Sequence, residues 1–503
     1  MERAGTPSVG LIGTFDIANY GDQLIPAITE LELRRRVPDI EIRRYAPFGW
    51  EHPVPADAGE LAEPLGPPTD LRREELAAAH DAILIGGGEI IHRFDELLAP
   101  HYGVDPADLK VRAPSEWFTA GAGPDAPTAW NVVGVPFDIA EEWAPTVRSA
   151  VRAHHYVSVR DDRSRARIEQ IGVEREIHVV PDPAFLLPRL HDPAVIDRRR
   201  RLHSVLGWIP SGRYIVVQGN GAMVHEAERM SAALDQLCAG HPDLSVVVVQ
   251  TGDGHGDAAF ARAFVERHPA RVWAPDAPLL PIDVVSLISG ADAFVGISLH
   301  GAITALAHGR RAVVFNATSQ SKLRGLADLL DQPECYVEES ADLAAALQWA
   351  LTTPGPDPAL PRLVAAVDAH FDRLAELVER SSRARDESGG STRVETRLRR
   401  LAAERDALRT AHDRRGRQLL RERDALAALI EEREHLLDGA QAQVRALEEA
   451  LLHERAELER HISQLQDERD RLHAEVSALK ATRTLRWLRV PRSIYGTYLR
   501  RRA

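Results

Sequence analysis

The first two-thirds of the chain alternates short β-rich runs with longer helical stretches. Most of the β-rich runs are continuously apolar, which is typical of strands buried on both faces of a parallel sheet. Alternation of such strands with helices, through short Gly, Asp and Asn turns, predicts an α/β fold. The predicted strands are Val9–Phe15, Ile40–Tyr45, Ala82–Ile85, Trp130–Val135, His155–Val159, Ile177–Val180, Tyr214–Gln218, Ser245–Gln250, Arg271–Trp273, Ala293–Gly296 and Ala312–Phe315.

The strands fall into two sets, which predicts two Rossmann-like lobes. His191–Ser211, rich in Arg and Pro and without a strand pattern, separates the sets. We therefore expect an N-terminal lobe over residues 1–195, and a C-terminal lobe with a closing helix over 205–380. A cleft between two such lobes is where strand carboxyl ends and helix N-termini converge on a ligand.

The remaining chain has a different pattern. Residues 381–393 are small and polar and predict a flexible linker. Residues 394–480 predict a long α-helical coiled coil, with self-association through 430–479, because apolar residues recur at sevens. A companion seam is mixed, and a single solvated helix remains the alternative for 394–425. The apolar positions are Ile430, Leu437, Val444, Leu451, Leu458, Leu465, Leu472 and Leu479.

Composition narrows the class of protein. The chain has 503 residues, 44% hydrophobic and 27% charged, which excludes disorder throughout. With only two cysteines the chain has no disulfide framework, and the CxxC spacing of zinc sites is absent, so a reducing cytoplasm is expected. No apolar run approaches the length of a membrane span. Residues 381–503 hold 27 Lys+Arg and 21 Asp+Glu, a net charge of +6. Because the whole chain has a net charge of −13, residues 1–380 carry −19. An acidic body argues against nucleic-acid binding.

The last residues, 481–503, form a basic amphipathic tail. They carry seven arginines and no acid, interleaved with Trp487, Tyr495 and Tyr498. Interfacial aromatics beside Arg favour an anionic membrane surface over nucleic acid as the partner, which would place the protein at the inner face of the membrane. Folding of the tail back on the acidic body is the alternative.

Candidate chemistry begins at the turn after the first strand, which contains Asn19, Gly21 and Asp22. Gly21 permits close backbone approach, and Asp22 either caps the following helix or binds substrate hydroxyls at the cleft. The pattern is not GxGxxG, so a dinucleotide fingerprint is not supported.

A second glycine-rich turn follows the third strand. Gly87, Gly88 and Glu89 stand at its end, where backbone N–H groups can reach an anion. Tight strand–helix packing is the structural alternative, and the GK[ST] of a P-loop is missing.

Two more charged side chains close the first lobe. Arg160 follows a strand and presents a cation suited to a carboxylate or phosphate, unless it pairs with Asp161 or Asp162. Asp182, between two prolines, is a helix cap or a hydroxyl acceptor at the cleft.

The second lobe offers two turns and a lysine. Gly219 and Asn220 follow its first strand; later Ser298, His300 and Gly301 stand between a strand and a helix. Because His300 lies at a turn rather than on an apolar face, we interpret it as a general acid/base rather than a core histidine. Lys322 follows as a further anion ligand.

Taken in order, these segments resemble the polysaccharide pyruvyl transferase family. They are GTFDIANYGDQLI, ILIGGGEIIH, SVRDDRS, PDPA, QGN and ISLHGAITALAHGRRAVVF, with Lys322 behind them. The resemblance covers about residues 8–350. It implies a two-lobed GT-B-like fold and transfer of a pyruvyl group from phosphoenolpyruvate to hydroxyls of a sugar, in a cell-surface glycan or its precursor.

The resemblance also implies roles at the site. His300 and Arg160 are expected to be catalytic, with no metal and no cofactor beyond the donor phosphoenolpyruvate. The family usually has Arg where Ser298 stands, so we expect either that one anion ligand is missing or that Arg160, Arg310, Arg311 or Lys322 replaces it. The rival functions are a GT-B glycosyltransferase using a nucleotide sugar, and a non-catalytic scaffold that binds a glycan or partner. Substrate contacts are expected from Asn19, Gly21, Asp22, Gly87, Gly88, Glu89, Asp182, Gly219, Asn220, Ser298, Gly301 and Lys322.

Overall fold

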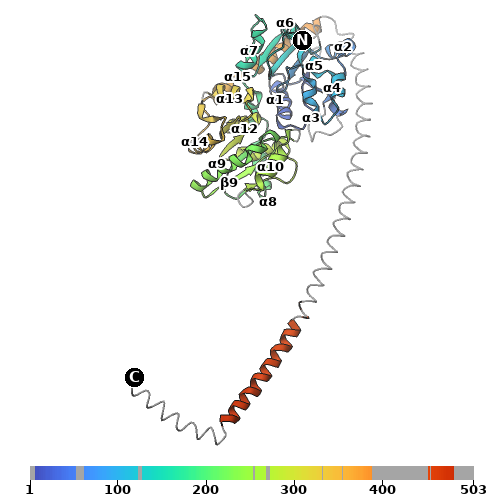
Figure 1. Cartoon of the computed structure of the whole chain (residues 1–503). Helices are drawn as coiled ribbons and strands as arrows, with labels where there is room; N and C mark the ends of the chain where they lie inside the picture. The colour runs from blue at the N-terminus through green and yellow to red at the C-terminus, as the bar shows by residue number, and fades with distance from the viewer. Residues whose placement is uncertain are drawn as a thin grey trace. The chain divides into compact units, whose positions relative to one another are not determined.

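A computed structural model describes two separate parts of the chain, a two-lobed body and a C-terminal helix (Figure 1). The described residues are 6–51, 62–122, 127–252, 255–267, 272–330, 332–353, 355–387, 451, 453 and 455–480. Among them, no helix has both the length and the apolar character needed to cross a membrane.

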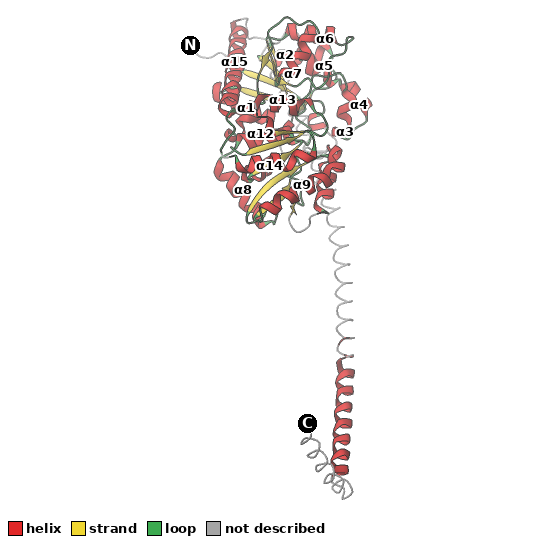
Figure 2. Ribbon diagram, turned by 60° about the vertical axis from the view of Figure 1, so that its left-hand side comes forward, coloured by secondary structure: helices red, strands yellow, loops and turns green. Residues whose placement is uncertain are grey.

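The first lobe is a parallel sheet with helices packed around it (Figure 2). Its strands are β1 Ser8–Ile12, β2 Glu41–Ala46, β3 Glu63–Pro64, β4 Ala82–Gly86, β5 Thr128–Val133, β6 Tyr156–Val159 and β7 His178–Val179. Its helices are α1 Tyr20–Arg36, α2 Asp70–Ala79, α3 Ala99–Tyr102, α4 Pro106–Arg112, α5 Pro114–Ala120, α6 Ala144–Ala153 and α7 Asp162–Gln170. The central strands β1, β4 and β5 are buried along their whole length, as their apolar runs predict.

The second lobe repeats this design. Its strands are β8 Arg213–Gln218, β9 Leu244–Val248, β10 Val272–Trp273, β11 Ala293–Gly296, β12 Arg311–Phe315 and β13 Tyr336–Val337. Its helices are α8 Pro193–Val205, α9 Ala227–Gly240, α10 Asp257–Val265, α11 Pro281–Gly290, α12 Leu299–Ala307, α13 Ser321–Leu330 and α14 Leu343–Thr352. The chain then ends the body with α15 Leu360–Glu387.

The strand orders are β3-β2-β1-β4-β5-β6-β7 and β10-β9-β8-β11-β12-β13, all pairs parallel. Both contain the 3-2-1-4-5-6 order of a Rossmann sheet, so the predicted pair of Rossmann-like, GT-B-like lobes is confirmed. All eleven predicted strands are present. The sequence missed β3 and β13, two-residue edge strands too short to give an apolar run.

Two helices differ from the expected domain pattern. The stretch His191–Ser211, which the sequence predicts to be the crossover between the lobes, contains α8, capped by Asp192 and packed on α11. The closing helix α15 extends to Glu387, into the predicted linker 381–393, and packs on α1, β1 and β4 of the first lobe. The chain therefore returns to its first lobe at the end of the body.

A cluster of ion pairs fixes α15 to the first lobe. Glu32 of α1 is fully buried and meets Arg36 Nη1 at 2.5 Å and Arg189 Nη1 at 3.2 Å. Both arginines also bind Asp368 of α15, at 3.0 and 2.7 Å. The hydrogen bonds from Arg189, followed by those from Arg36, lower the pKa of Asp368 to about 2 against the effect of burial. Asp368 therefore supports the fold while ionised, and this support is lost as pH falls from about 4 to about 2.

Replacing Glu32 by Ala is expected to destabilise the body by about 3 kcal/mol, because two partly buried arginines lose their buried counter-charge. Asp372→Ala is the matched control: this carboxylate also binds Arg36, but its side chain is 64% exposed, so the cost is expected to stay below about 1 kcal/mol. Urea unfolding at pH 7 measures both. Equal losses for the two variants would contradict the assignment of Glu32 as the centre of the cluster.

The C-terminal helix, residues 455–480, presents an apolar stripe to solvent. Its large apolar side chains are 42–58% exposed and occupy two heptad positions; they are Leu458, Ile462, Leu465, Leu472, Val476 and Leu479. The first position is leucine throughout, and the second holds Ile462 and Val476 but also Arg455 and Arg469. Leucine at one position with β-branched residues at the other favours a parallel two-stranded coiled coil. Glu475 and Lys480, five residues apart, would face each other across such a pair. The predicted coiled-coil residues 394–450, 452 and 454, and the tail, 481–503, lie outside the described residues; Leu451, which is described, is exposed.

We therefore predict that the full chain is a dimer. Light scattering is expected to give twice the chain mass, and the chain mass alone for a version that ends at Glu387. Leu465→Asp with Leu472→Asp should also give the monomer mass, because charges would enter the apolar seam. A monomeric full chain would contradict self-association through 430–479.

Candidate functional site

The site forms where the carboxyl ends of the two sheets face each other. Asn19 caps α1 by accepting hydrogen bonds from the N–H groups of Gly21 and Asp22. The same turn pairs with the second lobe: Asn19 bridges to Gly252, and the Tyr20 N–H donates to the Thr251 carbonyl at 2.8 Å. The first turn of α1 is thus part of both lobes' packing.

His300 stands in the first turn of α12, directly against Gly21. A Cβ at residue 21 would lie 2.0 Å from His300 Nδ1, so only glycine permits this approach. On the other side, His300 Nε2 lies 3.3 Å from Asp182 Oδ2, an ion-pair distance without hydrogen-bond angles. Burial alone would raise the pKa of Asp182, but the His300 imidazole and the Ala184 N–H hold it below its ordinary value. An ionised carboxylate therefore orients the imidazole.

A second carboxyl group lies beside the imidazole. Asp22 Oδ1 accepts a hydrogen bond from the Thr14 hydroxyl at 2.6 Å and lies close to Gly88. Burial raises the pKa of Asp22 to about 6, although Thr14, His300 and Lys322 each oppose the shift. A carboxyl group that titrates near neutrality next to a histidine is a candidate for proton transfer.

The cations of the site share one carboxylate. Glu89, after β4, binds Arg160 Nη2 at 2.7 Å and Lys322 Nζ at 3.3 Å. Burial would raise the pKa of Glu89, but Lys322 and Arg160 lower it to about 2. The Arg160 guanidinium is buried against Gly134 and also lies 3.5 Å from Asp161. The expected pairing of Arg160 with Asp161 is therefore present, but Glu89 is its closer partner.

Ser298 stands where the family usually has Arg, and here it is a helix cap. Its hydroxyl accepts the Gly301 N–H at 3.1 Å, so the N–H of this expected substrate contact already has a partner. Arg310 donates to the Ser289 carbonyl, and Arg311 pairs with Asp357. Of the four expected replacements for the family arginine, Arg160 and Lys322 reach the same carboxylate, whereas Arg310 and Arg311 bind elsewhere.

Of the remaining predicted residues, two glycines lie at the site and two residues lie elsewhere. Gly87 and Gly88, with φ of 121° and 82°, form the left-handed turn that brings Glu89 to the cations. Gly219 packs on the Phe260 ring, and Asn220 caps the short helix that follows it. We find no contact of Gly219 or Asn220 with His300, Arg160 or Lys322 among the described residues.

Three residues that support the site were not predicted from the sequence. Thr14, Gly134 and Thr304 were not singled out, yet Thr14 binds Asp22, Gly134 seats Arg160, and the Thr304 hydroxyl bonds both the His300 carbonyl and Tyr20. Thr14 and Gly134 both follow strand ends, which is the signal that could have found them. In the part of the chain that the structure describes, no three His, Cys, Asp or Glu side chains gather as metal ligands.

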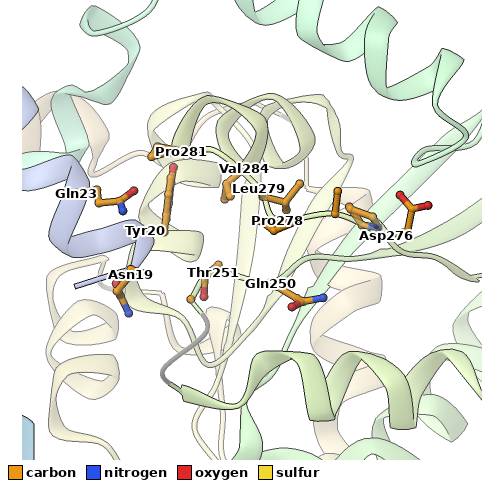
Figure 3. A pocket seen from close by; sticks show the side chains of 14 residues that line it. Asn19, Tyr20, Gln23, Gln250, Thr251, Asp276, Pro278, Leu279, Pro281 and Val284 are labelled. Atoms are coloured by element: carbon orange, nitrogen blue, oxygen red, sulfur yellow. The ribbon is translucent and has the colours of Figure 1, made fainter. Parts of the chain in front are cut away.

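A cavity of about 460 Å³ adjoins this cluster through the first turn of α1 (Figure 3). Tyr20 and Gln23 form one wall, and Thr251, Asp276 and the start of α11 form the other. Its fourteen described lining residues include amide, hydroxyl and one carboxylate group, with proline and aliphatic surface, but neither Lys nor Arg.

Comparisons with known proteins give one family and several distant structures. The family model "Polysaccharide pyruvyl transferase" matches residues 19–319. Among curated proteins, none matches the sequence. Solved structures similar to this chain include the UDP-GlcNAc 2-epimerase from Neisseria meningitidis bound to UDP-GlcNAc (10% identity, 74% of this chain and 100% of that chain, TM-score 0.45). A glycosyltransferase from Rickettsia africae is similar at 11% identity over 77% of this chain and 98% of that chain, with TM-score 0.41.

Asp22→Asn is expected to stabilise the body at neutral pH, because the raised pKa means that ionising Asp22 opposes folding. The penalty is absent below about pH 4, grows as pH rises to about 6, and is then constant, so the gain should reach about 1–3 kcal/mol at pH 7. The amide keeps an acceptor for Thr14. Urea unfolding of both proteins at pH 4 and pH 7 measures the difference; a gain that does not depend on pH would contradict the assignment.

Proposed function

Because this chain belongs to the polysaccharide pyruvyl transferase family, we propose that it transfers a pyruvyl group from phosphoenolpyruvate to hydroxyls of a sugar. The observation that carries the proposal is the meeting of an oriented imidazole with two cations at the carboxyl ends of both sheets. His300 with Asp182 supplies a proton donor and acceptor; Arg160 and Lys322 supply positive charge for an anionic donor.

The chemistry uses each of these groups. Protonation of the methylene carbon of phosphoenolpyruvate leaves a cation at the central carbon, which a sugar hydroxyl attacks with loss of its proton. Phosphate then leaves, and attack by a second hydroxyl closes a ketal. His300 is the proposed acid/base for these transfers, and Asp22, which interacts electrostatically with His300 and has a pKa of about 6, is a second candidate for proton transfer. Positive charge at Arg160 and Lys322 favours departure of phosphate.

Glu89 sets a condition on donor binding. Its ionised carboxylate already neutralises both cations, so the carboxylate or phosphate of the donor must replace it on at least one of them. We propose that Glu89 holds Arg160 and Lys322 in place until phosphoenolpyruvate arrives.

The adjoining cavity is the proposed acceptor pocket. Amide and hydroxyl groups with apolar surface suit a sugar ring, and the lack of Lys and Arg among its described lining residues disfavours a nucleotide diphosphate there. This argues for a neutral glycan acceptor over the nucleotide-sugar glycosyltransferase. A reaction that uses phosphoenolpyruvate fits the cytoplasmic location that the sequence predicts.

The test is release of inorganic phosphate from phosphoenolpyruvate, which neither rival function requires. With a panel of sugars as acceptors, wild-type protein should release phosphate, and His300→Ala should lose at least about 100-fold in rate. His308→Ala, at the other end of α12, is the matched control and should remain active. Release that is unchanged in His300→Ala would remove the proposed acid/base, and no release with any acceptor would favour one of the two rivals, the nucleotide-sugar glycosyltransferase or the scaffold.

Two variants test where the donor binds. Arg160→Lys should weaken phosphoenolpyruvate binding about tenfold, because an ammonium does not replace a bidentate fork. Glu89→Gln should tighten it, because the competing carboxylate is gone. Titration calorimetry without acceptor measures both affinities; unchanged values in both variants would show that the donor binds away from this cluster.

A further inference from the structure

The outward face of α8 combines aliphatic and basic side chains. Val195, Leu202, Val205 and Leu206 are 38, 42, 84 and 50% exposed. Their spacing of 7, 10 and 11 residues from Val195 puts them on one side of the helix. Figure 1 shows α8 at the lower edge of the second lobe.

This stripe is not needed by the core of the lobe. On its inner side α8 buries Ile196 and His203, and His203 Nε2 bonds Asp283 of α11 at 2.9 Å. Other large apolar side chains exposed on the described body are spread over separate elements; they are Leu71, Leu97, Val111, Phe137 and Val224. Only α8 collects several on one face.

Positive charge lies on the same face. Arg198 is within the stripe by its spacing, and Arg201 borders it; both are exposed and have no ion pair among the described residues. Arg199 and Arg200, by contrast, pair with Asp283 and Asp197. Two unpaired arginines on an acidic body leave a local site for anions.

We propose that this face of α8 docks on an anionic lipid bilayer. The aliphatic side chains would enter the boundary between the lipid headgroups and the acyl chains, while the guanidinium groups bind lipid phosphates. A free anion would bind only the arginines, and a purely apolar partner would contact only the aliphatic side chains. After α8 the chain turns at Gly207, and the Trp208 indole donates to Asp276 at 2.8 Å. Asp276 lines the cavity, so docking through α8 brings a cavity wall close to the membrane. Such docking would bring the proposed acceptor pocket close to a lipid-linked acceptor. This consequence rests on the proposed function, whereas the docking itself does not.

The test is co-sedimentation of the full chain with vesicles of phosphatidylcholine alone or mixed with phosphatidylglycerol. Wild-type protein should pellet only with the anionic vesicles, and less in high salt. Arg198→Gln with Arg201→Gln should weaken binding about thirty-fold at low salt, from about 1 kcal/mol per arginine. Arg152→Gln with Arg383→Gln, exposed arginines of α6 and α15, is the control with the same change in charge and should bind as wild type.

The apolar contribution has its own pair of variants. Val205→Asn should also weaken binding to anionic vesicles, whereas Leu71→Asn, 67% exposed on α2, should not. Equal losses in the α8 and control variants, or no loss in either α8 variant, would overturn the proposal, as would a change in oligomeric mass that shows α8 to contact a second copy. Failure of phosphate release from phosphoenolpyruvate would leave the vesicle result standing, so the two proposals fail separately.

Discussion

The two lobes meet at the site because residue 21 has no side chain. The α1 turn lies against α12 so closely that a Cβ at Gly21 would clash with the His300 ring. The neighbouring Tyr20 is fixed to the second lobe twice, by its N–H to Thr251 and by its hydroxyl to Thr304 at 2.8 Å. One short turn thus sets the position of the imidazole on one side and forms a cavity wall on the other.

Charge balance then decides what the site residues do. The surroundings of the carboxyl groups near the imidazole and the cations separate their pKa values. Lys322 and Arg160 keep Glu89 ionised, and His300 keeps Asp182 ionised. At Asp22 burial outweighs the opposing effects of Thr14, His300 and Lys322, so this group titrates near neutrality. Differences of this kind assign distinct roles to chemically similar residues. Arg160 and Lys322 are both already paired with the Glu89 carboxylate, so an anionic ligand of these cations would have to compete with it.

The sequence predicted the sheets well because buried parallel strands leave an apolar signature, as in β4 and β12. It also selected His300, Arg160 and Lys322 from their places after strands and turns. It could not pair Glu89 with Lys322, which are distant in the chain and meet only when both lobes form. Nor could it separate caps from ligands: Ser298 and Asn220 have side chains suited to both uses, and both serve as caps. The sequence did not predict the helix α8, because its exposed aliphatic residues interrupt the polar face that a surface helix usually has.

The return of α15 to the first lobe has a mechanical consequence. The backbone passes between the lobes twice, once after Arg189 and once before Leu360, and the ion pair of Arg189 with Asp368 ties the two passages together. The two passages therefore lie beside each other, and they join the lobes in addition to the contacts of Tyr20 with Thr251 and Thr304. A cut in either passage alone leaves the lobes joined through the other.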